Sequence, residues 1–231
     1  MRFDIMTLFP DLVDTVLGES IIGRARTSGV ITVNCHNIRD YSENKHNRVD
    51  DTPYGGGRGM LMAAPPIYNC YKAVVSDMRE DETSLCVYMS PRGKIFDESD
   101  ARRFSKYDRL IILCGHYEGV DERIIEEIVD EEISIGDFVL TGGEIPACIV
   151  CDATARLVPG VLSAEECYEN ESFGELNRLE YPQYTRPPVF RGREVPEVLI
   201  SGHHENIDKW RREQMERITR ERRPDMIKKE E

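Results

Sequence analysis

Short apolar runs alternate with longer amphipathic segments along the first two thirds of the chain, and this alternation constrains the fold most. Short runs rich in Val, Ile and Leu are typical of buried strands, and apolar residues at helical spacing are typical of helices that cover a sheet. The expected strands are residues 3–9, 31–38, 85–89, 110–114 and 132–135, and the expected helices are 12–17, 67–78, 97–107, 121–130 and 144–157. Because such alternation produces parallel sheets with helical crossovers, we expect an α/β fold with a mainly parallel sheet and helices on both faces.

The pattern changes after Pro159. Residues 163–175 are polar and acidic without periodicity, which indicates a linker. The proline-rich and aromatic stretch YPQYTRPPVFRG follows, and it leads to an amphipathic helix that contains Trp210. We therefore expect a domain over residues 1–160, a flexible linker over 161–176 and a small helical domain over 177–231.

The charge of the chain is strongly acidic as a whole but basic near its end. The formal net charge is −13, which disfavours nonspecific binding to nucleic acid. Residues 209–223, however, carry seven Lys and Arg against three Glu, so this helix could hold RNA locally. No apolar run has the length of a membrane span, and the first residues lack the pattern of a signal peptide. With seven scattered cysteines, these features predict a reduced, cytoplasmic protein.

Three segments of small and polar residues follow expected strands. They are residues 90–93 (SPRG), 115–119 (GHYEG) and 136–143 (GDFVLTGG). In open parallel sheets, ligands bind beyond the carboxyl ends of the strands. Each segment alone could simply turn the chain, but the three together predict a pocket for one small ligand.

Other motifs are weaker. The run GGGRG at residues 55–59 lacks the lysine and hydroxyl of a P-loop, and no G-x-G-x-x-G joins a strand to a helix. Cys148 and Cys151 form a single C-x-x-C on an apolar helix, which favours buried structural cysteines over a redox or zinc site. The pair His203–His204 is more typical of a polar helix start than of a metal site.

Seven motifs occur in a fixed order: GGGRGMLM, SPRG, CGHYEGVDER, SIGDFVLTGGE, DATARLVPGVL, NESF and YPQYTRP. Through them essentially the whole chain resembles the bacterial tRNA (guanine-N1)-methyltransferases of the TrmD type, in the SPOUT superfamily. The resemblance implies methyl transfer from S-adenosylmethionine to N1 of guanine 37 in tRNA, next to the anticodon. It also implies a deep trefoil knot in the first domain, a homodimer with active sites at the subunit interface, and a magnesium ion whose position the sequence does not give.

The resemblance assigns the three segments to the cofactor, with Ile135 and Leu140 flanking the adenine. The implied cofactor-binding residues are Tyr88, Met89, Ser90 and Pro91 in the first segment, Gly115, Tyr117, Glu118 and Gly119 in the second, and Ser134, Ile135, Gly136, Asp137, Phe138, Val139, Leu140, Gly142, Gly143 and Pro146 in the third. The resemblance implies that the glycine run lies beside this pocket, close to where the guanine would enter, and it leaves open whether residues 57–59 touch the guanine, the cofactor or neither. Arg58 stands where proline is common in the family.

The chemistry requires a base and a cation. N1 of guanine carries a proton at neutral pH, so a general base should remove it, and a fixed cation should stabilise the negative charge that spreads to O6. The resemblance assigns Glu171 as the base, where many members carry Asp, Arg156 as the cation, and Glu180 as a second acidic candidate. From composition alone, Arg156 could pair with a helix carboxylate and Glu171 could be a solvated linker residue.

RNA contacts are expected on the last helix. Arg211, Arg212, Arg217 and Arg220 would hold the backbone of the anticodon stem, which positions RNA without reading its sequence. Three alternatives stay open at this point: a related SPOUT enzyme that modifies a ribose or another base, a noncatalytic RNA-binding protein with a cofactor-shaped pocket, and a scaffold protein that binds no cofactor.

Overall fold

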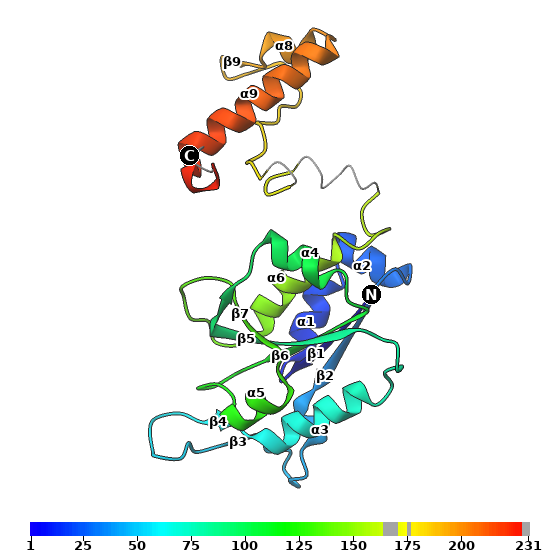
Figure 1. Ribbon diagram of the computed structural model, residues 1–231, viewed down its shortest axis with the longest axis vertical. Coiled ribbons are helices and arrows are strands. Elements are labelled where there is room, and N and C mark those ends of the chain that lie inside the picture. The colour runs from blue at the N-terminus through cyan, green and yellow to red at the C-terminus, as the bar shows by residue number, and fades with distance from the viewer. Residues whose placement is uncertain (164–170, 175–176, 228–231) are drawn as a thin grey trace. The chain divides into compact units, whose positions relative to one another are not determined.

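The computed structural model describes residues 1–163, 171–174 and 177–227. The chain divides into two compact units, Met1–Ser163 and Ala164–Glu231 (Figure 1). The linker expected at 161–176 falls largely on residues 164–170 and 175–176, which lie outside the described residues. The division of the chain into functional domains stays a prediction.

A five-stranded sheet forms the centre of the first unit. Its strands are β1 (Arg2–Thr7), β2 (Thr32–Asn37), β5 (Ser84–Ile95), β6 (Arg109–Cys114) and β7 (Glu131–Ser134). They lie in the order β2-β1-β6-β5-β7, and each neighbouring pair is parallel. This confirms the prediction of a mainly parallel sheet.

Helices cover both faces of this sheet (Figure 1), as the sequence predicts. One face packs against α1 (Pro10–Leu17), α2 (Ser20–Thr27), α4 (Glu98–Phe104) and α6 (Glu144–Ala155), and the other against α3 (Ala64–Val75) and α5 (Glu122–Ile128). Successive residues of a strand point to opposite faces. In β6, Ile112 therefore joins the first apolar cluster, while Ile111 and Leu113 join the second.

Local sequence signals fix where several helices begin. The Asp97 side chain accepts hydrogen bonds from the backbone N–H groups of Ser99 and Asp100, and Asp100 completes a capping box at the start of α4. Asp121 caps α5 in the same way through the N–H of Arg123. These caps satisfy donors that the first helical turn leaves unpaired.

Two features of the first unit differ from the sequence expectation. Helix α2 was not expected, and residues 90–93 form no loop, because β5 continues through them to Ile95. The pairing of β5 with β7 changes register between Met89 and Lys94, so that Lys94 opposes Ile133. Gly93 permits this crossing, because a Cβ there would collide with the backbone of Glu132 and Ile133. The connections also include η1 (Ile38–Tyr41), β3 (Asp50–Asp51) and β4 (Leu61–Met62).

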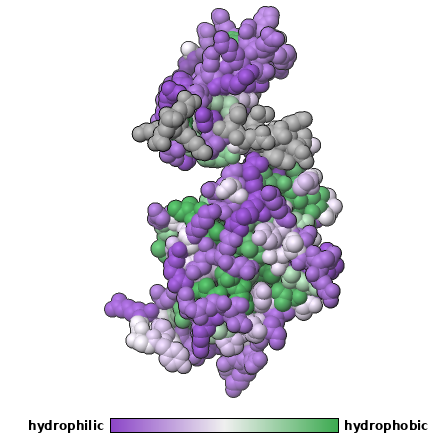
Figure 2. All heavy atoms as spheres, in the orientation of Figure 1, coloured by the Kyte–Doolittle hydropathy of each residue, from purple (hydrophilic) through white to green (hydrophobic). Residues whose placement is uncertain are grey.

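The second unit is built on one long helix, α9 (His204–Arg222), which begins at the expected histidine pair. It also contains the hairpin β8 (Val189–Phe190) and β9 (Arg193–Glu194), the short helix α8 (Glu197–Ile200) and η2 (Pro224–Met226). Figure 2 shows that the visible surface of this unit is predominantly hydrophilic, whereas the visible surface of the first unit also contains hydrophobic residues. Among the described residues, no helix has both the length and the apolar character needed to cross a bilayer.

Candidate functional site

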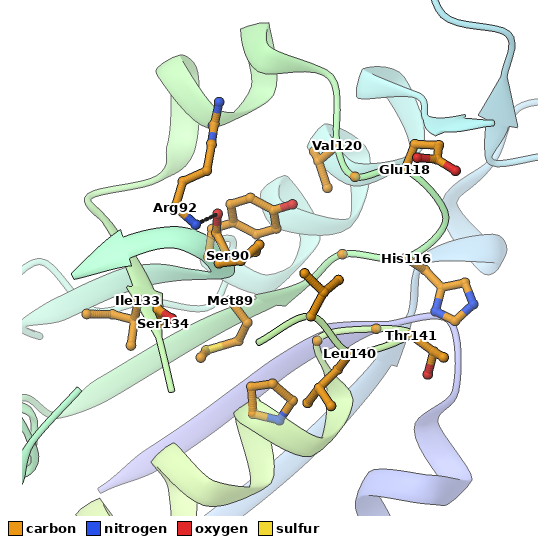
Figure 3. Close-up of a pocket in the computed structure, with 18 of the residues that line it drawn as sticks. Met89, Ser90, Arg92, His116, Glu118, Val120, Ile133, Ser134, Leu140 and Thr141 are labelled. Atoms are coloured by element: carbon orange, nitrogen blue, oxygen red, sulfur yellow. Dashed lines mark hydrogen bonds between the residues drawn. The ribbon is translucent and has the colours of Figure 1, made fainter. Parts of the chain in front are cut away.

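A cavity of about 520 Å³ opens where the carboxyl ends of β6 and β7 meet the middle of β5. Its wall comes from β5, from residues 115–120 after β6, from residues 134–143 after β7, and from the start of α6. Figure 3 shows Met89 reaching the cavity from β5 and Leu140 and Thr141 from the segment after β7, with His116 and Glu118 at one end of the view. The three segments singled out in the sequence therefore meet at one place.

All of the residues expected to bind the cofactor line this cavity except Asp137. Residues that the sequence reasoning missed line it too: Leu61, Arg92, His116, Val120, Glu122, Ile125, Ile133 and Thr141. Arg92, His116 and Thr141 lie inside the three segments but were not assigned to the cofactor, and Val120 and Ile133 directly adjoin assigned residues. Glu122 and Ile125, by contrast, lie on α5 and reach the cavity only because of the fold.

Glycines let the second and third segments pack backbone against backbone. The N–H of Gly143 donates to the carbonyl of Gly115 at 2.8 Å. A Cβ on Gly143 would lie 2.8 Å from Cα of Cys114 and 3.0 Å from the nitrogen of Gly115, which is closer than real Cβ atoms approach. An isolated β-bridge between His116 and Gly142 adds to the same contact. These glycines therefore fix the spacing of the cavity wall.

Tyr88 is a buried aromatic side chain with a hydroxyl group in the wall of the cavity. Its side chain is nearly inaccessible to solvent. A Cβ added to Gly115 would come within 2.8 Å of the Tyr88 hydroxyl oxygen, so only glycine leaves room for this ring. Burial raises the pKa of Tyr88 to about 12, and the charge of Glu132 adds to the shift. The phenol therefore stays protonated at neutral pH and can donate a hydrogen bond to a ligand.

Arg92, Glu122 and Glu132 form an ionic cluster beside the cavity. The guanidinium of Arg92 lies 3.1 Å from a carboxylate oxygen of Glu122 and 3.2 Å from one of Glu132. Its backbone N–H donates to the Ser90 hydroxyl at 3.2 Å, the contact that is dashed in Figure 3. The cluster joins β5, α5 and β7, so it holds together three elements that contribute to the wall.

The glycine run lies in the connection between β3 and β4, which leads directly into the wall. The N–H of Glu118 donates to the carbonyl of Met60 at 2.9 Å, and that of Met62 donates to the carbonyl of Gly119 at 2.9 Å. A Cβ on Gly59, whose φ is +86°, would collide with the Glu118 side chain. The run therefore lies beside the cavity, as the sequence predicts. Whether residues 57–59 touch the guanine, the cofactor or neither stays an open question.

The expected catalytic residues lie on both units. Arg156 directly follows α6 in the first unit, and Glu171 and Glu180 belong to the second unit. The N–H of Glu180 donates to the Ser172 hydroxyl at 2.9 Å, and a Glu180 carboxylate oxygen accepts from the Gln183 amide at 2.6 Å. The roles of all three residues stay predictions.

Cys148 and Cys151 are buried on α6, as the sequence predicts. Burial raises the pKa of the Cys148 thiol to about 11 and also raises that of Cys151, so both stay as unreactive thiols at neutral pH. Among the described residues, no group of three or more His, Cys, Asp and Glu could hold a metal ion.

The fold and the cavity define a class of protein: α/β proteins that bind a small ligand at the carboxyl edge of a parallel sheet. A family model described as tRNA (Guanine-1)-methyltransferase TrmD matches residues 1–229. The chain therefore belongs to the TrmD family of tRNA (guanine-1)-methyltransferases.

Curated relatives match over nearly the full length. A tRNA (guanine-N(1)-)-methyltransferase of Ruminiclostridium cellulolyticum is 56% identical over 230 residues, covering 99% of this chain and 97% of the relative. Proteins of the same name from Clostridioides difficile and Lachnospira eligens are 55% and 54% identical, covering 99% and 98% of this chain and 98% and 94% of the relatives. The resemblance found in the sequence motifs is thereby confirmed.

Proposed function

We propose that the protein transfers a methyl group from S-adenosylmethionine to N1 of guanine 37 in tRNA, with the cofactor held in the cavity at the sheet edge. The match to the TrmD family over residues 1–229 is the observation that supports this reaction. The three segments meet around one cavity of about 520 Å³, which supports the assignment of their residues to the cofactor. Cavities of roughly 300–1,000 Å³ are usual for ligands of this size.

The residues of the cavity fit the cofactor. Its wall offers backbone N–H and C=O groups of the second and third segments, which can hydrogen-bond the edge of an adenine. Met89, Leu140 and Pro146 supply apolar surface for the faces of the ring. Phe138, Val139 and Leu140 are 54%, 81% and 43% exposed, so apolar surface at the cavity is available for a ligand to cover.

When bound, S-adenosylmethionine supplies an electrophilic methyl group on a sulfonium, whose departing sulfur keeps the electron pair of the broken C–S bond. Glu171 accepts the N1 proton of guanine as the new N–C bond forms. Arg156 stabilises the negative charge that gathers on O6 in the transition state. Glu180 is the second acidic candidate near this chemistry. Tyr88 and the second and third segments, which pack closely through their glycines, hold the methyl donor in place and exclude water.

The proposal extends to the assembly. Helices α1 and α6 pack against each other, and they expose Leu12, Val16, Ile145 and Ile149 by 41%, 49%, 48% and 44%. We infer that this apolar face is the homodimer interface, because paired copies would remove it from water. Ile149→Asp is expected to produce a monomer in sedimentation analysis, and a dimer of unchanged affinity would refute the assignment.

Three finer expectations also belong to the proposal. A deep knot rests on the family resemblance, and the Gly143–Gly115 hydrogen bond is consistent with it in that it brings residues 142–143 against 115–116. Magnesium dependence rests on the resemblance alone, since the described residues hold no candidate metal cluster. Rate measurements with and without a chelator test it. A cytoplasmic location, where tRNA is the substrate, is part of the same proposal.

The decisive experiment is methyl transfer to an unmodified tRNA transcript, compared with a transcript in which guanine 37 is replaced. We expect 1-methylguanosine after digestion of the first transcript and no product from the second. A methylated ribose or a different base would identify another SPOUT activity, and equal transfer to both transcripts would refute the specificity. Calorimetry with S-adenosylmethionine separates these outcomes from a scaffold protein, which would give no binding heat.

Variants test the catalytic assignments. Glu171→Gln keeps the size of the side chain but removes the base, so we expect methyl transfer to fall by about 10²–10⁴-fold while cofactor affinity stays the same. Arg156→Ala is expected to lower the rate by about 10²–10³-fold, the usual cost of losing one oxyanion donor. Turnover near the normal rate in either variant would remove that residue from the mechanism.

A further inference from the structure

The segment that carries Glu171 and Glu180 forms a turn closed by its own hydrogen bonds. We call the described residues 171–174 and 177–180 the base turn. The N–H of Phe173 donates to the carbonyl of Arg178 at 3.0 Å, and the N–H of Glu180 donates to the Ser172 hydroxyl at 2.9 Å. Because these bonds join the two stretches, the position of Glu171 is linked to that of residues 178–180.

Two contacts anchor the base turn on one stretch of α9. The N–H of Leu179 donates at 2.8 Å to the hydroxyl of Thr219, a side chain that is completely buried. The guanidinium Nε of Arg178 donates at 3.0 Å to a carboxylate oxygen of Glu216, one turn earlier on the helix. These two contacts therefore fix the position of the base turn on α9.

A third contact lies just beyond the helix. The guanidinium of Arg223 sits 5.8 Å from the centre of the Phe173 ring, within the range of a cation–π interaction. Arg223 is itself oriented by Asp225, whose carboxylate lies 2.7 Å from it. The base turn is thus held at both of its described ends.

Glu216 is shared between the base turn and the proposed RNA-binding face. One of its carboxylate oxygens accepts from Arg178, and the other lies 3.1 Å from the guanidinium of Arg220, one turn further along α9. The hydrogen bond from Arg178, and then that from Arg220, lowers the pKa of Glu216, so this carboxylate stays charged between the two arginines. A hollow on α9 is lined by Arg212, Glu213, Glu216, Arg217 and Arg220.

We propose that Arg178 is a positioning residue for methyl transfer, which couples RNA bound along α9 to the place of the catalytic carboxylate through Glu216. This rests on the proposed function, in which Glu171 is the base and α9 holds RNA phosphates. A phosphate that engages Arg220 competes with Glu216 for that guanidinium and leaves the carboxylate to Arg178. The pair Arg178–Glu216 then tightens, and the base turn is fixed on α9 when RNA is present.

The test separates the rate of the chemical step from binding. Arg178→Met keeps the aliphatic length of the side chain and removes its charge. At saturating tRNA and S-adenosylmethionine we expect single-turnover methyl transfer to slow by about tenfold or more, since misplaced catalytic groups cost up to about 10²-fold. Cofactor affinity, measured by calorimetry, and the KM for tRNA should stay within about twofold of the wild-type values, whereas loss of a phosphate contact would raise the KM.

A double-mutant cycle assigns the effect to the contact with Glu216. Glu216→Gln should slow the same step, and the double variant should be slowed by less than the two single effects combined, because both substitutions weaken the contact between Arg178 and Glu216. Arg178→Lys restores a cation and should recover part of the rate. Arg79→Met serves as the matched control, since Arg79 is an exposed arginine of the first unit that pairs with Asp81, and it should react at the wild-type rate.

Folding of each variant is checked by the fluorescence of Trp210, the single tryptophan of the chain, which lies on α9. Should Arg178→Met not fold, Arg178→Lys compared with Glu216→Gln carries the same test. A wild-type rate in folded Arg178→Met, together with an inactive Glu171→Gln, overturns the positioning role and leaves the proposed function intact. Full activity of Glu171→Gln would overturn the catalytic assignment and this inference with it.

Discussion

Replacing Gly143 by alanine perturbs the cavity at the point where its two glycine-rich segments touch. The backbone there has φ −83° and ψ −4°, which alanine adopts without strain. The cost therefore arises only from the new Cβ, which would lie 2.8 Å from Cα of Cys114 and 3.2 Å from its Cβ. Overpacking of this kind costs about 1–3 kcal/mol, and loss of the Gly143–Gly115 hydrogen bond adds about 1 kcal/mol.

The free energy of unfolding should thus fall by about 2–4 kcal/mol, which lowers the melting temperature by about 5–15 °C for a unit of this size. Because the second and third segments must separate, calorimetry should show affinity for S-adenosylmethionine reduced by about tenfold or more. The two measurements are made on the same preparation, so that loss of affinity is compared with the fraction folded.

Gly29→Ala is the matched control. Gly29 has φ +75° and no atom within 4 Å of an added Cβ, so alanine there is strained but collides with nothing. It should cost about 1–2 kcal/mol of stability without changing cofactor affinity, since Gly29 is not part of the cavity wall. Wild-type affinity in folded Gly143→Ala would show that the spacing of the two segments does not shape the binding site.

Three other outcomes follow from the charges. Arg109→Met should lower the free energy of unfolding in urea by about 3–5 kcal/mol, because Arg109 is 2% exposed and lies 2.7 Å from Glu82 and 2.8 Å from Asp77; a loss under about 1 kcal/mol would contradict this. Burial raises the pKa of Asp4, but hydrogen bonds from His36, Arg2 and Asn34 outweigh burial and hold that pKa below its usual range. The stability that Asp4 contributes should therefore be complete above about pH 4 and fall as the pH drops through the folded pKa, and thermal melts at pH 2–6 that show no such loss would refute it. Arg212→Met should weaken tRNA binding and reduce the slope of log affinity against log salt by about one, and an unchanged slope would remove Arg212 from the phosphate contacts.

The sequence predicts the sheet of the first unit well, for a local reason. Strand β6 reads as one apolar run and is buried along its whole length, and α5 and α4 begin at aspartates that cap them. Helix α2 escaped prediction because it is short, contains Gly23 and has no side-chain cap. The continuation of β5 through residues 90–93 was missed because Pro91 and Gly93 read as a turn, while the register shift against β7 that accommodates them is a tertiary feature.

The candidate site likewise contains residues that the sequence predicts and residues that come together only after folding. Residues of the three segments could be found as motifs, because each segment is continuous in the sequence. Glu122 and the cluster that it forms with Arg92 and Glu132 could not, since the three residues belong to different elements and meet only after folding. The docking of the base turn on Thr219 is of this kind too, because about forty residues separate Leu179 from its partner.

The place of β1 inside the sheet, between β2 and β6, also has a consequence for synthesis of the chain. β1 leaves the ribosome before the other four strands of its sheet, yet one of its two neighbours, β6, begins about a hundred residues later. At about 5–20 residues per second, that partner follows after roughly 5–20 s. During this interval β1 can pair only with β2, and its other edge and its apolar side chains stay without their final partners. A nascent chain stalled before Arg109 therefore exposes an open strand edge, which makes it a natural client for chaperones that act at the ribosome.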